Sequence, residues 1–123
     1  MLRGDILLDQ ILTDLVSSVK GARAVIFLDG EGESIALYGE AGVDMKFLGA
    51  WKEIHLDRIR EITGRLKLGE VHAVLFSLEE GNELLVPVAG EYCLLLLLSS
   101  FADLKEAMAG TTKAVELLKK EVE

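Results

Sequence analysis

The chain has 123 residues, of which 50% are hydrophobic and 28% are charged; this is a globular composition and excludes a disordered chain. That length suits one domain over residues 1–123 and leaves little room for a second. The formal net charge of −8 argues against nucleic acid and anionic membranes as partners, because both are bound through Lys and Arg that meet phosphates.

The first predicted element is a helix from Asp5 to Lys20. Its apolar residues recur every three or four positions and form one broad stripe, which is the pattern of an amphipathic helix. Asp5 is expected to cap the start of this helix, and Gly21 is expected to close its end.

A β-hairpin is predicted next. Ala24 to Leu28 is an unbroken run of apolar, strand-forming residues, which is typical of a strand that is covered on both faces and central in its sheet. Asp29-Gly30-Glu31-Gly32 is a strong turn signal, so Ser34 to Tyr38 is expected to be the returning strand.

The second predicted helix runs from about Asp44 to Thr63 and carries more apolar surface than one buried face requires. Two apolar stripes lie side by side on it. The first consists of Leu48, Ile59 and Ile62, with His55 between them, and the second of Phe47, Trp51 and Ile54. The surplus apolar arc is a candidate interaction surface.

Three strands are predicted after this helix: Glu70 to Ser77, Glu83 to Val88 and Tyr92 to Leu98. The first alternates between two faces, with Val71, Ala73 and Leu75 on one side and His72, Val74 and Phe76 on the other. Pro87, near the end of the middle strand, has no amide hydrogen to donate. The last strand is continuously apolar and is expected to be central.

The last helix is predicted to begin at Ser100-Phe101-Ala102-Asp103, a sequence similar to a capping box with Asp in place of Glu or Gln. Whether Gly110 interrupts this helix is left open by the pattern. The residues expected in its buried stripe are Phe101, Leu104, Met108, Thr111, Val115, Leu118 and Val122.

The predicted order of elements is therefore α-β-β-α-β-β-β-α. The hairpins imply a five-stranded, mainly antiparallel sheet sandwiched by helices. The expected fold class is α/β, of the α+β, profilin-like kind.

No catalytic, cofactor-binding or metal site emerges from the residue patterns. The stretch from Gly30 to Ser34 lacks the lysine of a phosphate loop and the third glycine of a dinucleotide fingerprint. No carboxylate pattern joins His55 and His72 into a metal site, and Cys93 has no nearby positive charge in the sequence to activate its thiol. The carboxylates are scattered over turns and helix exteriors. We therefore expect a protein that is not an enzyme and uses no cofactor.

The cysteine content and the apolar runs favour a cytoplasmic protein. Cys93 is the single cysteine, so no disulfide can form within the chain, and a thiol in an apolar run suits a reducing compartment. Asp9, Gln10 and Asp14 interrupt the apolar residues near the start, which argues against a signal peptide. The apolar run Leu94 to Leu98 is far too short to insert across a membrane.

Two surface features favour self-association: the surplus apolar arc with Phe47, Trp51 and Ile54, and the alternating strand Glu70 to Ser77. If this strand lies at a sheet edge, its unpaired backbone groups invite another strand. Two copies that join edge to edge, with their second helices packed across the seam, satisfy both features in one isologous contact. The alternative is that Phe47 and Trp51 fill the core of a single copy.

The order of elements and three stretches of sequence resemble the roadblock family of dynein-light-chain-like domains. Residues 21–32 are similar to its first strand and hairpin, residues 68–76 to its third strand, and residues 84–98 to its fourth and fifth strands. The similarity covers nearly the whole chain, and bacterial and archaeal members of about this length are the nearest kind.

The resemblance implies a homodimer or heterodimer with a continuous sheet across the two-fold axis and with the second helices paired on one face. It also implies regulation or scaffolding of a small Ras-like GTPase, as in gliding-motility regulators of the MglB type, which stimulate hydrolysis by their GTPase. The GTPase would meet the exposed side of the paired helices. Carried onto this chain, the implied dimer surface consists of Phe47, Trp51, Ile54, Arg58, Val71, Ala73 and Leu75.

Three further possibilities are weighed against this function. An arginine finger from Arg58, Arg60 or Arg65 is disfavoured, because arginines on helix surfaces are usually solvated. A small-ligand sensor needs a cavity with convergent polar groups, which the central strands do not supply. An adaptor role in another protein assembly stays open.

Overall fold

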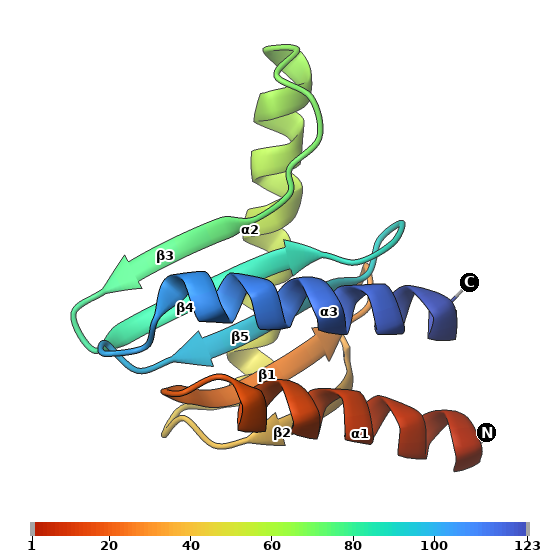
Figure 1. Ribbon diagram of the computed structural model, residues 1–123. Helices are drawn as coiled ribbons and strands as arrows, with labels where there is room; N and C mark the ends of the chain where they lie inside the picture. Colours follow the sequence, from red (N-terminus) through yellow and green to blue (C-terminus); the bar gives the residue numbers. More distant parts are fainter. Residues whose placement is uncertain (1, 123) are drawn as a thin grey trace.

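In the computed structural model, which describes the backbone of residues 2–122 and the side chains of residues 7–122, the helices and strands follow the predicted order (Figure 1). All four pairs of neighbouring strands are antiparallel, so the predicted fold class is confirmed. In chain order the elements are α1 (Leu2–Ser18), β1 (Ala22–Leu28), β2 (Ser34–Gly39), α2 (Met45–Arg65), β3 (Val74–Leu78), β4 (Gly81–Pro87), β5 (Cys93–Leu98) and α3 (Leu104–Val122).

The strands form one sheet in the order β2-β1-β5-β4-β3. β5 lies in the centre with β1 beside it, and residues 24–28 and 93–98 of these two strands are buried. The two unbroken apolar runs therefore occupy the central positions that the sequence predicts. β3 lies at one edge of the sheet and β2 at the other.

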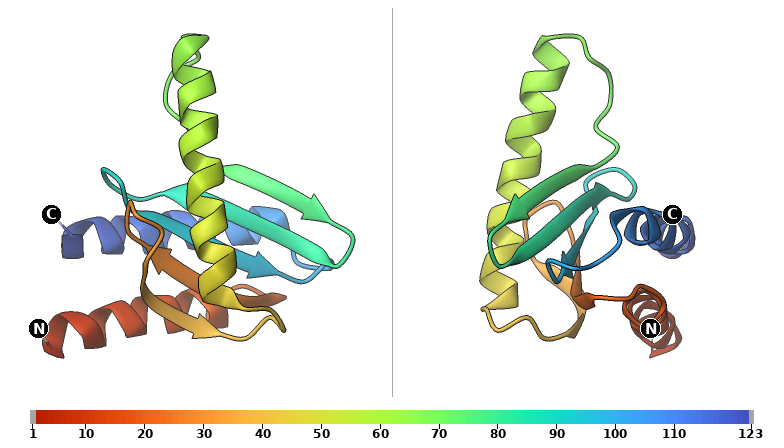
Figure 2. Two further views of the ribbon diagram at one scale, coloured as in Figure 1. Left: turned by 180° about the vertical axis from the view of Figure 1, so that it is seen from behind. Right: turned by 60° about the vertical axis from the view of Figure 1, so that its left-hand side comes forward.

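Helices cover both faces of this sheet: α1 and α3 lie on one face and α2 on the other (Figure 2). Phe27 shares a core cluster with Leu12 of α1 and Leu118 of α3. Its neighbour Ile26 points to the opposite face and shares a second cluster with Leu56 of α2. The core is thus divided by the sheet into two layers.

The turn between β1 and β2 is held by Asp29. Its carboxylate accepts hydrogen bonds from the amides of Glu31 and Glu33 at 2.9 and 3.0 Å. Gly32 has a φ of 82°, in the left-handed region that favours glycine, and its amide donates to the carbonyl of Asp29 at 3.1 Å. The glycine-rich stretch is therefore a hairpin turn, as predicted.

The start of β3 differs from the prediction, because the strand begins at Val74 rather than at Glu70. Its register pairs Val74 with Leu85 of β4. Two residues further along, the same register would place His72 opposite Pro87.

Pro87 explains why the ladder stops there. The amide of the next residue, Val88, donates to the carbonyl of Tyr92 on the β5 side at 2.9 Å. Because successive amides of a strand point to opposite sides, the nitrogen of Pro87 faces β3, where it has no hydrogen to donate. Residues 69–73 therefore leave the sheet.

The ends of α1 confirm one prediction and correct another. α1 begins at Leu2, so Asp5 lies inside the helix and does not occupy the cap position before it. At the other end Gly21 has a φ of 89°, and the amide of Ala22 donates to the carbonyl of Val19 at 3.1 Å. A glycine in this conformation closes the helix as predicted.

The start of α3 also differs from the prediction. Asp103, and not Ser100, is the cap: its carboxylate accepts hydrogen bonds from the amides of Lys105 and Glu106 at 2.9 and 3.2 Å. Phe101 precedes the helix and is 72% exposed, so it is not part of the buried stripe.

The buried stripe of α3 is shorter than predicted. Leu104 and Met108 are exposed, whereas the later part of the predicted stripe, Thr111, Val115 and Leu118, is buried. Gly110 does not interrupt the helix.

α2 packs on the sheet mainly through residues outside its predicted apolar stripes, although Leu48 of the first stripe also packs against this core layer. Its buried residues are Met45, Gly49, Lys52, Glu53 and Leu56, and they end about half-way along the helix. The remainder projects beyond the sheet, and the chain returns along it to β3 (Figures 1 and 2). Two of the five buried residues, Lys52 and Glu53, carry ionisable side chains, so sequence hydrophobicity alone does not reveal this face.

Gly49 sets how closely α2 approaches the sheet, which gives a testable prediction. A Cβ at Gly49 would lie 2.9 Å from Cδ2 of the buried Leu28, whereas a Cβ at Gly64 of the same helix would meet no atom within 4 Å. Gly49→Ala is expected to lower the free energy of unfolding by about 1–3 kcal/mol through overpacking. Gly64→Ala, the matched control, is expected to raise it by about 0.5–1 kcal/mol. Urea denaturation checks both values, and a stabilised Gly49→Ala variant would contradict this packing.

Candidate functional site

The outward face of α2, opposite to the sheet, carries an apolar stripe. Phe47, Trp51 and Ile54 follow one another at helical spacing and are 64%, 49% and 43% exposed. Arg58 and Ile62, also exposed, continue the same line along the helix. Phe47 and Trp51 therefore do not fill the core of the chain, and the alternative that assigned them to it is wrong.

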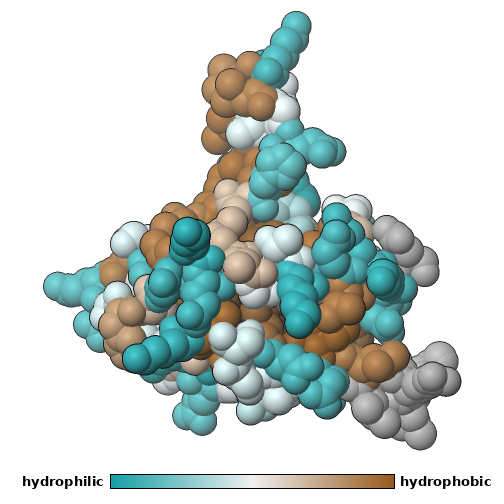
Figure 3. Space-filling model, viewed as in Figure 1, coloured by the Kyte–Doolittle hydropathy of each residue, from teal (hydrophilic) through white to brown (hydrophobic). Residues whose placement is uncertain are grey.

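Apolar surface extends onto the projecting end of α2. Figure 3 shows hydrophobic side chains gathered there. Leu66 and Leu68, which follow directly after the helix, are both exposed, as is Ile62 within it. A run of large apolar side chains in solvent is typical of a surface that contacts another macromolecule.

Aromatic rings connect this stripe to the edge of the sheet. The ring centroids of Phe47 and Trp51 lie 6.2 Å apart, and those of Trp51 and His55 lie 6.5 Å apart. The ring of His55 in turn lies 6.1 Å from that of Phe76 on β3. The apolar surface of α2 therefore continues without a break onto β3.

β3 has a neighbour, β4, on one side only. The backbone groups along its outer side have no partner strand among the described residues, which is the condition under which a sheet recruits another strand. We call this edge, together with the α2 residues Phe47, Trp51, Ile54 and Arg58 and the β3 residue Phe76, the α2–β3 surface.

A buried ion pair lies beneath the α2–β3 surface. Nζ of Lys52 lies 2.9 Å from Oε1 of Glu83 on β4, and both side chains are largely buried. The same ammonium group lies 3.7 Å from the centroid of the Phe76 ring, which is a cation–π contact. Lys52 thus joins α2 to β4 and β3 at the point where the surface is formed.

Next to Lys52, Glu53 is 4% exposed and points toward the sheet side of α2. The pKa of the Glu53 carboxyl is raised from 4.5 to about 7, first by burial and then by a hydrogen bond with Asp57 and by the negative charge of Asp57. The charge of Arg60 opposes this shift. Glu53 therefore takes up a proton near neutral pH.

The raised pKa of Glu53 predicts a dependence of stability on pH. Between pH 4.5 and 7 the folded chain holds a proton on Glu53 that the unfolded chain releases, so stability falls as pH rises through this window. Glu53→Gln removes this loss, so the free energy of unfolding of the variant relative to the unsubstituted chain is expected to increase by about 2–3 kcal/mol from pH 5 to pH 8. Urea unfolding of both proteins at both pH values measures this increase. An increase no larger than that of Glu61→Gln, which removes an exposed carboxylate of α2, would contradict the raised pKa of Glu53.

The structure separates the predicted seam residues into two groups. Phe47, Trp51, Ile54 and Arg58 lie together on the outward face of α2. Leu75 is exposed on β3, but it pairs with Leu84, which belongs to the core layer beneath α1 and α3. Leu75 therefore points to the face of the sheet opposite to α2.

Val71 and Ala73 differ more from the prediction, because they precede β3 and do not belong to it. Val71 packs against the core layer of α2 and Ala73 against the layer of α1 and α3, so the predicted alternation does not hold there. Phe76 takes their place in the α2–β3 surface, and the ring of His55 lies between it and Trp51. The sequence did contain an indication for Phe76, because the alternating pattern of the predicted strand placed it on the face opposite to Leu75.

The remaining candidates for chemistry lie apart from this surface. Cys93 is buried in β5, and burial raises the pKa of its thiol to about 12, so the thiol stays protonated at neutral pH. Among residues 2–122 there is no cluster of three or more His, Cys, Asp and Glu side chains that could hold a metal ion. No helix in this part of the chain has the length and hydrophobicity to cross a membrane.

The fold is that of roadblock/LC7 domains. A roadblock/LC7 domain from Streptomyces avermitilis superimposes with a TM-score of 0.86 over 93% of this chain and 96% of its own, at 17% identity. MglB from Myxococcus xanthus gives a TM-score of 0.86 over 94% of this chain and 86% of its own, at 15% identity. Profilin IA from Acanthamoeba castellanii is less similar, with a TM-score of 0.61 over 97% and 98% at 14% identity. No protein-family model and no curated protein matches the sequence.

Proposed function

We propose that the chain works as a dimer whose two copies join through the α2–β3 surface. The observation that supports this is the combination of an exposed apolar stripe with an adjoining open strand edge. An edge-to-edge contact would pair β3 with the partner's β3 and satisfy the free backbone groups of both. The same two-fold axis would bring the α2 helices together and bury Phe47, Trp51 and Ile54.

The contributions of the individual residues to this dimer follow from their exposure. Arg58 would lie on the seam beside the apolar stripe, and Leu75 would meet the partner from the other face of the joined sheet. Val71 and Ala73, half-buried against their own chain, would contribute only at the margin.

We further propose that the dimer is a non-catalytic regulator or scaffold of a small Ras-like GTPase. This rests on the roadblock/LC7 fold, and on the resemblance of the sequence to a family whose members regulate or scaffold such GTPases. The GTPase would meet the exposed side of the paired α2 helices, whose projecting ends carry Leu66 and Leu68. Such a regulator needs no reactive residue of its own if it positions groups of the GTPase around the bound nucleotide.

Affinity capture with the full chain, carried out with GDP and with a non-hydrolysable GTP analogue, tests the choice of partner. Recovery of a Ras-like GTPase in one nucleotide state is the expected result and would support a regulator. Equal recovery in both states would support a scaffold. Recovery of no GTPase in either state would contradict the proposal and favour an adaptor role in another assembly.

The role of Arg58 can be tested with the GTPase that is recovered. An arginine finger is worth about 10³–10⁵ in the rate of hydrolysis. Because the proposed dimer would hold Arg58 at the seam and away from the active site of the GTPase, Arg58→Ala is expected to change the stimulated rate by less than about tenfold. Single-turnover hydrolysis measures this rate, and a loss of a thousandfold or more would instead identify Arg58 as a finger.

A further inference from the structure

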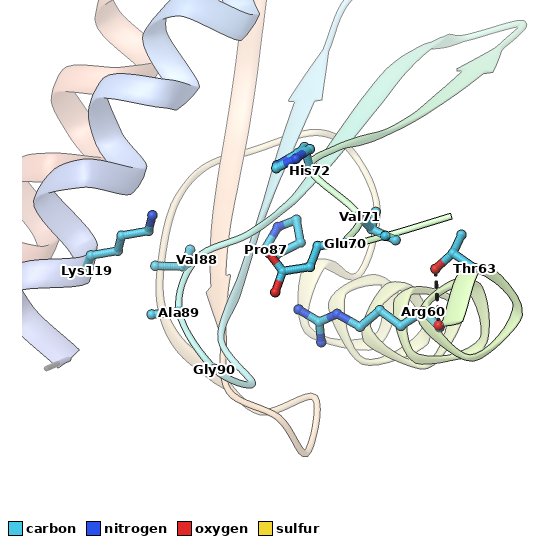
Figure 4. Close-up of a pocket in the computed structure, with 11 residues that line it drawn as sticks. Arg60, Thr63, Glu70, Val71, His72, Pro87, Val88, Ala89, Gly90 and Lys119 are labelled. Carbon is cyan, nitrogen blue, oxygen red and sulfur yellow. Dashed lines mark hydrogen bonds between the residues drawn. The ribbon is translucent and has the colours of Figure 1, made fainter. Parts of the chain in front are cut away.

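A cavity of about 620 Å³ lies where residues 69–73 leave the sheet (Figure 4). Its walls are this segment, the end of β4 with the following turn, and one residue of α3, Lys119. α2 contributes Arg60 and Thr63, which the helical spacing places on the side away from the outward stripe. The volume is in the range of small-molecule sites.

Two of the three charged side chains that line this cavity are cationic, although the whole chain has a net charge of −8. Arg60 and Lys119 extend into it from opposite walls, and His72 adds a ring nitrogen (Figure 4). Glu70 is the one carboxylate among the lining residues.

These cations are weakly neutralised within the chain. The ion pairs among side chains 7–122 are Lys52–Glu83 and Arg60–Asp57, and the second has a distance of 3.7 Å. Lys119 takes part in neither of them. The two positive groups can therefore bind an anion without first giving up a close ion pair among the described side chains.

Backbone amides in the wall formed by residues 69–73 are available to donate hydrogen bonds. Residues 69–73 lie outside β3, and among residues 2–122 their amides donate to no backbone carbonyl. Pro87, which has no amide hydrogen to offer on this side, lines the cavity at the point where the ladder stops.

We propose that this cavity binds a small anion with two negative charges, such as a phosphate monoester or a dicarboxylate. Arg60 can clamp two oxygens of such a group with its planar fork, and Lys119 supplies a point charge from the opposite wall. Amides of residues 69–72 complete the donor set. The site is separate from the α2–β3 surface and requires neither a GTPase nor the dimer.

Isothermal titration calorimetry of the full chain at constant ionic strength tests this site, with inorganic phosphate and succinate as separate probes. Binding to one site per chain, with a Kd of about 1 mM or lower for at least one probe, is expected. Lys119→Met and Arg60→Met, on separate helices, are each expected to weaken binding about tenfold. Lys120→Met, which removes the neighbouring exposed charge, is expected to weaken it less than about twofold.

The two probes distinguish the sources of the anion. If phosphate alone binds saturably, the ligand class is a phosphate ester, and if succinate alone binds, it is a dicarboxylate. If both bind, the site recognises the charge pattern that they share. Each of these results supports the site. Absence of saturable binding for both probes would overturn it. An equal loss of binding in Lys120→Met and Lys119→Met would also overturn it, because the attraction would then come from the general charge of α3.

Discussion

Replacing Trp51 with glutamate is expected to convert a dimer into a monomer. Trp51 lies in the middle of the exposed α2 stripe, between Phe47 and Ile54, and the two-fold axis would place both copies of the new charge at one seam. If each tryptophan contributes about 2 kcal/mol, the loss is about 4 kcal/mol, or about a thousandfold in Kd. Light scattering after gel filtration should give twice the chain mass of 13.4 kDa for the unsubstituted chain and the single mass for the variant.

A matched control for this result is Phe101→Glu. Phe101 is also an exposed aromatic residue, at 72%, but it lies before α3 and outside the α2–β3 surface. Its replacement should leave the dimer mass unchanged. A dimeric Trp51→Glu variant, or equal dissociation in both variants, would show that the copies meet elsewhere.

Replacing Lys52 with methionine is expected to destabilise the chain far more than removal of an exposed charge from α2. The change would leave the carboxylate of Glu83 largely buried without the ammonium group that lies 2.9 Å from it. It would also remove the cation–π contact with Phe76. Loss of one partner of such a pair costs about 3 kcal/mol, which urea denaturation can measure.

The double variant Lys52→Met with Glu83→Gln distinguishes the cost of leaving Glu83 unpaired from the loss of the ion pair as such. Because it leaves no buried charge unpaired, it should recover most of the lost free energy of unfolding. Lys46→Met, on the exposed side of the same helix, should change stability by less than about 0.5 kcal/mol. A Lys52→Met variant as stable as Lys46→Met would contradict the role given to the ion pair.

Much of the fold could be predicted because local patterns and tertiary environment agree along most of the chain. The apolar runs of β1 and β5 indicated central strands, and both lie inside the sheet. The turn at Asp29 was recognisable because its signal depends on neighbours in sequence.

The start of β3 could not be predicted from its own residues. Alternation continues through Glu70 to Ala73, but the strand ends where Pro87 of the neighbouring strand lacks a donor. Which residue lies opposite Pro87 depends on the register, and the register is fixed only in the folded sheet.

The buried face of α2 was missed for a similar reason. Lys52 and Glu53 are charged and read as solvent-exposed, yet both are buried. Glu83, which neutralises Lys52, comes from a strand distant in sequence. Gly49 is buried because its lack of a side chain lets the helix approach the sheet closely, and not because it is hydrophobic. The stripe that the sequence did identify, with Phe47, Trp51 and Ile54, is therefore left on the outside.

Amide hydrogen exchange of β3 tests the edge-to-edge dimer most directly. If β3 pairs with its copy, the amides of β3 that point away from β4 should be protected in the unsubstituted chain and should exchange rapidly in Trp51→Glu. β2, the other edge strand, serves as an internal control and should exchange alike in both proteins. Equally rapid exchange of these β3 amides in the dimer and in the variant would contradict the continuous sheet.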